Sequence, residues 1–127
     1  MRFKLFILLV ASDQISKLLA IKYSQPVFNS GVAFGVGRGI PGLVIIIVFL
    51  ILSILVFRGR SGLGEMLLLA GGAGNILDRL VYGKIVDWIR FVNLWFNLAD
   101  VYIGLGMILI ISKIIFIRTL KHENMRA

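Results

Sequence analysis

Cysteine is absent from this chain of 127 residues, and histidine occurs once, as His122. Without cysteine there is no disulfide, no thiol nucleophile and no Cys-based metal site. One histidine in the polar end of the sequence cannot supply a catalytic triad or a zinc site of the usual kind. These absences leave carboxylate chemistry as the main catalytic option, and we expect no metal and no cofactor.

Acidic residues are scarce. The chain has six Asp and Glu against 14 Lys and Arg, which gives a net charge of +8 at pH 7. The cations are spread between apolar runs, without a basic helix face or an aromatic RNA-binding motif, so we expect no nucleic-acid partner. Basic residues that flank apolar segments instead indicate membrane topology and contact with anionic membrane lipid.

Hydrophobic residues make up 59% of the chain and gather in long runs that indicate membrane spans. We expect an all-α integral membrane protein, a single domain over residues 1–127 built as a four-helix bundle. The four transmembrane helices are expected at residues 3–21, 41–57, 63–82 and 98–118. A signal peptide is an alternative reading of MRFKLFILLVAS, but the apolar pattern resumes at Leu18 and no small-x-small cleavage site clearly ends it.

Two connecting segments differ from these apolar runs. Residues 22–40 contain Pro26 and repeated glycine among alternating apolar residues, which favours short strands and turns over a helix. Residues 83–97 are predicted to form a loop, and they are rich in aromatic residues that favour a membrane–water interface.

Four spans place both termini on one side of the membrane. Seven Lys and Arg residues fall on that side and four on the other, so the positive-inside rule predicts cytoplasmic termini. Ionisable groups at the edge of an apolar segment are expensive and by default mark a functional site. With this topology all four aspartates reach the outer leaflet, namely Asp13, Asp78, Asp87 and Asp100.

Two close carboxylates could provide catalytic chemistry. Like charges held together cannot both ionise, so the pair shares one proton. One member can then act as a base toward water while the protonated member polarises a peptide carbonyl. Asp100 is one candidate, because with Asn97 as the N-cap it occupies the third position of a helix. The same Asn-x-x-Asp spacing is also an ordinary capping box, and the two readings are compatible.

The second member of the pair is open between Asp78 and Asp87. Asp78 is followed by Arg79, and an adjacent cation suits a structural ion pair better than a shared proton. Asp87 has no adjacent charge and lies between Val86 and Trp88, an apolar setting that would raise its pKa. We therefore predict Asp87.

Other polar residues have plain structural explanations as well. Asp13 and Lys17 are four apart and can form an i,i+4 pair that tethers the helix end, with Gln14 beside them. A supporting role in function is equally open for this trio. Asn29 could be only a turn residue, and the glycines of GGAG (71–74) could serve close helix packing.

Five short blocks in order are more specific than any single residue: DQISK (13–17), FNSGVAFG (28–35), GGAGNILDR (71–79), VDW (86–88) and FNLAD (96–100). Together they resemble the lipoprotein signal peptidases, the bacterial type II signal peptidases, which are intramembrane aspartyl proteases. The resemblance implies that Asp87 and Asp100 are the catalytic pair. It also implies supporting or substrate-binding roles for Asp13, Gln14, Lys17, Asn29, Gly31, Asn75, Asp78, Arg79 and Asn97.

The resemblance further implies a substrate and a location. Members of this family remove the signal peptide from prolipoproteins, cleaving before a cysteine that carries diacylglycerol, in the bacterial cytoplasmic (inner) membrane. Peptide antibiotics of the globomycin type are implied as inhibitors. Family members have a small extracytoplasmic β-rich platform after helix one, which residues 22–40 would form here. They also have a flap-like short helix between the two aspartates, and in this chain that segment is shortened.

Two other classes compete with the peptidase. A proton- or ion-coupled transporter or channel subunit would also use intramembrane Asp, Asn and Lys. A path across the bilayer, however, needs polar residues at several depths, and the predicted helix 41–57 offers only Ser53. A purely structural membrane subunit has no need of aspartates that converge on one side.

Overall fold

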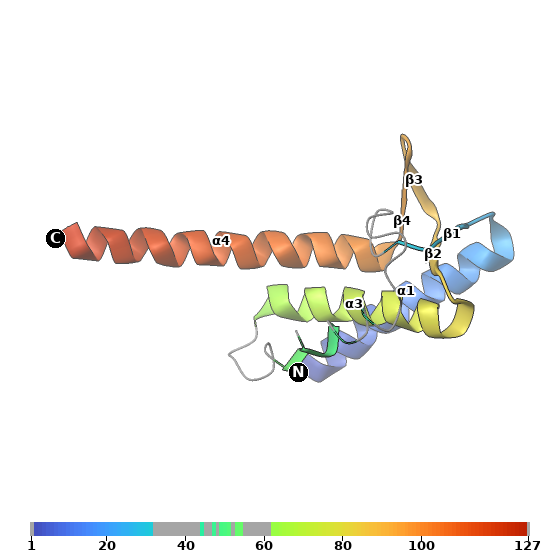
Figure 1. Ribbon diagram of the computed structural model, residues 1–127, viewed down its shortest axis with the longest axis horizontal. Helices are drawn as coiled ribbons and strands as arrows, with labels where there is room; N and C mark the ends of the chain where they lie inside the picture. Colours follow the sequence, from blue (N-terminus) through green and yellow to red (C-terminus); the bar gives the residue numbers. More distant parts are fainter. Residues whose placement is uncertain are drawn as a thin grey trace.

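The computed structural model describes residues 2–31 and 62–126, together with residues 44, 47, 49–51, 53 and 54. Three long helices run side by side and meet a group of short strands at one end (Figure 1). The described elements are, in chain order, α1 (Arg2–Tyr23), β1 (Val27–Asn29), α3 (Leu63–Tyr82), β2 (Ile85–Asp87), β3 (Ile89–Phe91), β4 (Leu94–Phe96) and α4 (Leu98–Arg126).

Most of the helix boundaries in the structure agree with those predicted from the sequence. Helices α1 and α3 occupy the predicted spans 3–21 and 63–82, and α3 is capped at its C-terminal end by Gly83, which adopts a left-handed conformation with φ 72°. Helix α4 begins at Leu98 as predicted but continues past residue 118 to Arg126. The segment predicted as a polar tail is thus helical, because it contains good helix formers and neither glycine nor proline. The predicted span 41–57 and residues 32–40 of the predicted platform segment 22–40 lie outside the described residues, apart from the single positions given above.

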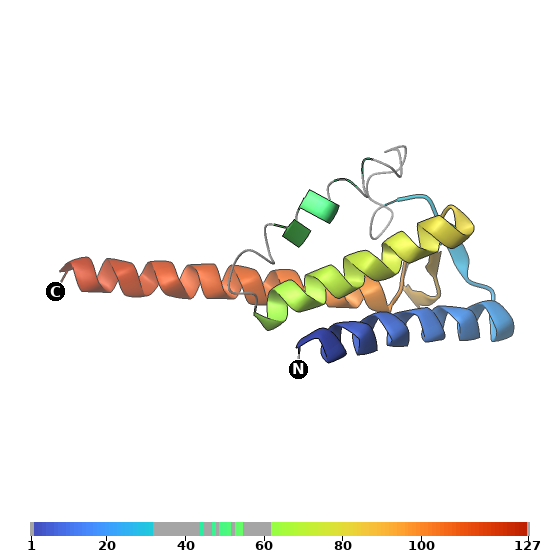
Figure 2. The ribbon, with the colours of Figure 1, turned by 90° about the horizontal axis from the view of Figure 1, so that it is seen from below.

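Helix α3 packs against both α4 and α1, as the two views show together (Figure 2). Glycine allows the closest approach between α3 and α4. A Cβ atom on Gly106 would lie 2.6 Å from the carbonyl oxygen of Gly64, and one on Gly71 would overlap the carbonyl oxygen of Ala99. Small residues at such contacts are typical of helices packed within membranes.

Polar side chains are buried and large apolar side chains are exposed, which is the reverse of their distribution in a soluble protein. Among the described residues, the largest fully buried side chains are mainly polar or charged, including Lys17 and four aspartates. Many large apolar side chains are exposed instead, for example Leu8, Ile108 and Phe116. Soluble proteins almost never bury charged groups in this way, whereas membrane proteins keep them in the bundle interior.

Helix α4 is, within the described residues, the one helix that is long and apolar enough to cross a membrane by length and composition, with a mean hydropathy of 2.1. Every stretch of 18 residues in α1 or α3 instead contains at least three charged residues, including Asp13 and Lys17 in α1, and Asp78 and Arg79 in α3. The structure therefore has a mostly helical fold with a membrane-spanning helix and a small β portion, and the count of four spans stays a prediction.

The strands form two antiparallel pairs. Strand β1 pairs with β2, with Val27 opposite Asp87, and β3 pairs with β4, with Arg90 opposite Trp95. The prediction of a loop over residues 83–97 was wrong, because this segment contains β2, β3 and β4. Its strands are only three residues long, but they consist largely of β-branched and aromatic residues, which favour strands.

Candidate active site

Four aspartates lie buried where the long helices meet the strands. They come from four different elements, and each is at most 1% exposed: Asp13 in α1, Asp78 in α3, Asp87 in β2 and Asp100 in the first turn of α4. The structure thus brings the acidic residues predicted from the sequence together. No group of three or more His, Cys, Asp or Glu residues that could hold a metal ion occurs in the part of the chain that the structure describes.

Lys17 forms ion pairs with two of these aspartates. Its Nζ atom lies 2.7 Å from Oδ2 of Asp13 and 2.7 Å from Oδ2 of Asp78, and it donates to Oδ1 of Asn75 at 3.3 Å. The predicted i,i+4 pair between Asp13 and Lys17 is confirmed. The predicted pair between Asp78 and Arg79 was wrong, because neighbouring side chains on a helix do not face each other. Lys17, from another helix, is the ionic partner of Asp78.

The Asp13 carboxylate ties α1 to the start of α4. Its Oδ1 atom accepts a hydrogen bond from the backbone N–H of Ala99 at 2.8 Å, and Ala99 directly precedes Asp100. This N–H is among the first four of the helix, which have no partner inside it. The contact needs Gly74, because a Cβ atom there would lie 2.5 Å from Oδ2 of Asp13. Asp13 therefore fixes the backbone beside Asp100.

Asp78 does the same for β2. Its Oδ2 atom accepts the backbone N–H of Val86 at 3.0 Å, and Val86 directly precedes Asp87. Its Oδ1 atom accepts from Nε2 of Gln14 at 2.9 Å, and the same Gln14 nitrogen lies 3.2 Å from Oδ2 of Asp13. The cluster centred on Lys17 thus holds the residue before each member of the predicted catalytic pair.

Asp87 is held by amides rather than by a cation. Nδ2 of Asn29 donates to its Oδ2 at 2.9 Å, and Nδ2 of Asn97 donates to its Oδ1 at 2.7 Å. The pairing of β1 with β2 carries Asn29 to this position from 58 residues away. Burial raises the pKa of Asp87 above its ordinary value, and the two amide hydrogen bonds oppose that rise only in part.

Asn97 connects Asp87 with Asp100. Its Oδ1 atom accepts the backbone N–H of Asp100 at 3.0 Å, and its own N–H lies 3.4 Å from Oδ2 of Asp100, so Asn97 caps α4 as predicted. Oδ1 of Asp100 also accepts from Nδ2 of Asn75 at 2.9 Å. Among the described residues, neither Asp87 nor Asp100 has a cation within ion-pair distance. Asn97 thus contacts both buried carboxylates, that of Asp87 through its side-chain amide and that of Asp100 through its backbone N–H.

Comparison with known proteins assigns the chain to a family. A family model for Signal peptidase (SPase) II matches residues 5–116. The chain belongs to the signal peptidase II family. The lipoprotein signal peptidase of Thermodesulfovibrio yellowstonii is 35% identical over 130 residues, covering 84% of this chain and 88% of that protein. The lipoprotein signal peptidase of Fusobacterium nucleatum subsp. nucleatum is 30% identical, covering 88% of this chain and 84% of that protein.

The fold agrees with the family assignment. A solved structure of a bacterial membrane enzyme superposes with a TM-score of 0.80 over 90% of this chain and 87% of that chain, at 23% identity. A second bacterial membrane enzyme gives a TM-score of 0.73 at 25% identity, over 89% and 91% of the two chains. This signal peptidase II chain is therefore a membrane protein of the peptidase class.

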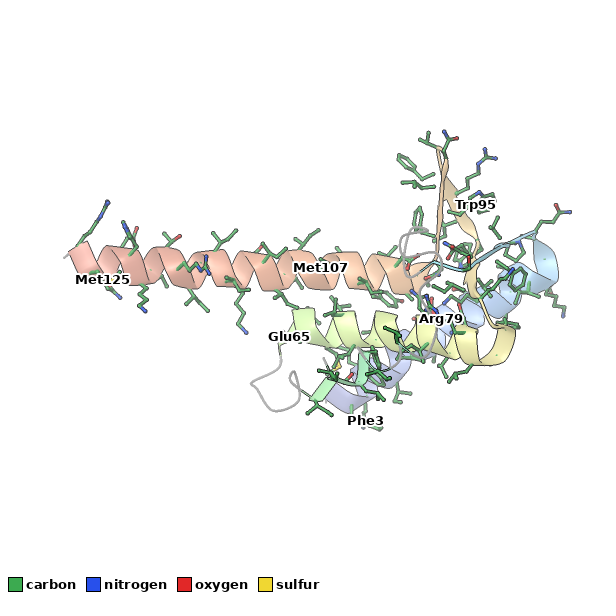
Figure 3. The ribbon with its side chains drawn as sticks, viewed as in Figure 1. Phe3, Glu65, Arg79, Trp95, Met107 and Met125 are labelled. Carbon is green, nitrogen blue, oxygen red and sulfur yellow. The ribbon has the colours of Figure 1, made fainter. Side chains whose placement is uncertain are left out.

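Arg79 lies at the edge of the aspartate cluster in this signal peptidase II fold. Its guanidinium donates to the backbone carbonyls of Asn75, at 3.1 Å, and of Gly31. The backbone N–H of Gly31 in turn donates to Oδ1 of Asn29 at 2.8 Å. Figure 3 shows Arg79 near the end of α3, where α3 meets the strands and the start of α4. Arg79 and Asn29 together fix the chain at Gly31, close to Asp87.

Some features of the site carried little signal in the sequence. The backbone N–H groups of Ala99 and Val86 belong to apolar residues, and nothing in the sequence marks them as ligands of the aspartates. Gly74 was assigned to helix packing in general, whereas it specifically makes room for the carboxylate of Asp13. The indole N–H of Trp88 is buried and, among the described residues, has no hydrogen-bond partner.

Proposed function

We propose that this chain is an aspartyl endopeptidase of the bacterial cytoplasmic membrane. It removes the signal peptide from diacylglyceryl-modified prolipoproteins by cleaving before the lipidated cysteine. The observation that carries the aspartyl mechanism is the pair formed by Asp87 and Asp100. Both are buried, both contact Asn97, and neither is neutralised by a cation among the described residues. Asp13 and Asp78, by contrast, both form ion pairs with Lys17, which suits a structural role better than a catalytic one.

In the proposed mechanism the Asp87 and Asp100 pair holds one proton in the resting enzyme. The ionised carboxylate removes a proton from a water molecule, and that water attacks the carbonyl carbon of the scissile peptide. The protonated carboxylate gives its proton to the carbonyl oxygen, so a neutral tetrahedral intermediate forms. Collapse of the intermediate returns one proton to the pair and transfers another to the leaving amine. The pair ends with one proton, as it began.

The remaining predicted residues are proposed to support this chemistry in two groups. The first group positions the backbone and side chains of the pair from within the bundle, and consists of Asp13, Gln14, Lys17, Asn75, Asp78 and Asn97. The second group lies on the β1 side of Asp87 and is proposed to position that aspartate or bind the substrate peptide, and consists of Asn29, Gly31 and Arg79. Mutating a residue of the second group should therefore change KM more than mutating a residue of the first.

The membrane placement is part of the same proposal. Four spans with both termini in the cytoplasm would put the aspartates in the outer leaflet, where a signal peptide anchored in the bilayer can reach them. The surrounding lipid and peptide antibiotics of the globomycin type are the further ligands that this function implies. The exposed apolar surface of α4 supports contact with lipid.

The decisive experiment is cleavage of a diacylglyceryl-modified prolipoprotein by the purified protein in detergent. Asp87→Asn and Asp100→Asn should each reduce cleavage by at least about 100-fold, because each removes one proton-transfer group. Glu123→Gln is the matched control, because Glu123 is an exposed acidic residue of α4. Near-normal turnover by either aspartate variant would remove that residue from the pair. A folded wild-type protein that fails to cleave would refute the peptidase function itself.

A further inference from the structure

The hairpin made by β3 and β4 has one face without a charged residue. Residues opposite each other in an antiparallel pair lie on the same face, and residues two apart on a strand share a face. Two apolar pairs therefore lie on one face, Ile89 with Phe96 and Phe91 with Leu94. The other face carries the pair of Arg90 and Trp95, in which the guanidinium lies 5.7 Å from the centre of the indole ring. The hairpin is amphipathic.

The apolar residues at the tip of this hairpin are exposed. Phe91 is 68% exposed, Val92 is 72% exposed and Leu94 is 50% exposed. Val92 also has φ of 55°, the one positive φ among the described non-glycine residues. A β-branched residue is strained in this conformation, and glycine or asparagine is the usual choice at such a turn. An apolar residue is thus present at the tip although a polar or flexible residue would suit the turn better.

The exposed charge of this region has one sign. Between the end of α3 and the start of α4 the charged residues are Lys84, Asp87 and Arg90. Asp87 is buried and the two cations are exposed, so the exposed charge is positive. An exposed apolar patch beside cations matches the chemistry of an anionic lipid interface.

The direction of the hairpin agrees with such an interface. In Figure 1 the hairpin starts at the N-terminal end of α4 and projects to one side of that helix, away from its axis. If α4 crosses the bilayer along its axis, the hairpin runs along the membrane plane.

We propose that the β3–β4 hairpin is an interfacial membrane arm. Its tip residues Phe91, Val92 and Leu94 lie in the boundary between the acyl chains and the headgroups of the outer leaflet, and Arg90 lies at the level of the lipid phosphates. The proposal rests on the membrane orientation given above but not on the catalytic mechanism. It makes the segment between the two catalytic aspartates a lipid-bound anchor that fixes the height of the site in the membrane.

The absence of cysteine allows a direct test by single-cysteine labelling. Val92→Cys, labelled with a nitrobenzoxadiazole fluorophore, is reconstituted without substrate into vesicles of phosphatidylethanolamine and phosphatidylglycerol. Ile108→Cys, on the exposed apolar surface of α4, is the control in hydrocarbon, and Glu123→Cys is the control in water. We expect the label at position 92 to emit at an intermediate wavelength and to be quenched by lipids that carry a nitroxide near the headgroup. An emission equal to that of the water control would overturn the proposal.

A second experiment distinguishes lipid from substrate as the partner of the hairpin tip. Phe91→Asn with Leu94→Asn, made in the Val92→Cys background, should shift the label toward the emission of the water control. In vesicles the same double change should raise KM several-fold while kcat stays within about twofold. A large fall in kcat with unchanged label depth would instead mean that the hairpin acts on the peptide, and would refute the anchor. The depth measurement uses no substrate, so an inactive enzyme would refute the peptidase function and leave this proposal standing.

Discussion

Replacing Lys17 by methionine tests whether the buried ion cluster is as important as its geometry indicates. Lys17 is 1% exposed, and its ammonium group contacts Asp13 and Asp78 at 2.7 Å each. Methionine keeps most of the side-chain volume but leaves two buried carboxylates without their cation. Breaking a buried ion pair by removing one partner costs about 3–5 kcal/mol. We expect Lys17→Met to lower the free energy of unfolding by that amount, measured by circular dichroism in micelles of increasing dodecyl sulfate content.

The matched control is Lys113→Met. Lys113 forms the other ion pair found among the described helices, with Glu65 at 3.5 Å, but its side chain is 54% exposed. An exposed pair of this kind contributes about 0–1 kcal/mol. If the two methionine variants lose the same small amount, the Lys17 cluster is solvated or mobile and our account of it is wrong. Adding Asp78→Asn to Lys17→Met removes one orphaned carboxylate, so the double variant should lose less than the sum of the two single changes.

Two further predictions concern helix packing and the protonation of Asp87, a member of the proposed catalytic pair. Gly106→Ala should lower the free energy of unfolding by about 1–3 kcal/mol, because its Cβ would meet the backbone of Gly64 and the chain has to shift. Gly104→Ala, at a position of the same helix where an added Cβ would meet no described atom within 4 Å apart from its own stretch of helix, should instead raise the free energy of unfolding by about 0.5–1 kcal/mol. Because burial raises the pKa of Asp87 in the folded state, folding there favours the protonated form, and the stability it contributes is lost as pH rises through the raised pKa. The stability of wild type relative to Asp87→Asn should therefore fall from pH 4 upward in thermal unfolding, and a constant or rising difference would contradict the assignment.

The parts of the site that follow local periodicity could be predicted from the sequence. Asp13 and Lys17 are one helical turn apart, and the helix alone brings them into contact. Asn97 and Asp100 have the spacing of a cap, and the helix begins where that spacing places it. In both cases the contact spans at most four residues, so the backbone geometry of one helix determines it.

The parts that depend on pairing between distant segments could not be predicted. Asn29 reaches Asp87 only through the register of β1 against β2, and a shift of one residue would turn its side chain to the other face. The hairpin at residues 89–96 was missed because the first residue of its turn, which has a positive φ, is Val92 in place of glycine or asparagine, and Asn93 alone is a weak turn signal. Asp78 was predicted to form an ion pair with Arg79, its neighbour in sequence. Helix geometry directs these two side chains apart, and the ionic partner of Asp78 is Lys17 from another helix.

The desolvation free energy that the Lys17 cluster costs indicates that the cluster has a role beyond stability. Removing charges from water is expensive, and a buried ion pair is often no more stable than apolar residues of the same volume. Apolar residues at positions 13 and 78 could replace the volume, but they could not accept the N–H of Ala99 or of Val86. Those two N–H groups belong to the residues that precede the proposed catalytic aspartates, so the cluster fixes the pair through the backbone on both sides. A cluster retained for stability alone would not need both contacts. We infer that its function is to fix the positions of Asp87 and Asp100 relative to each other.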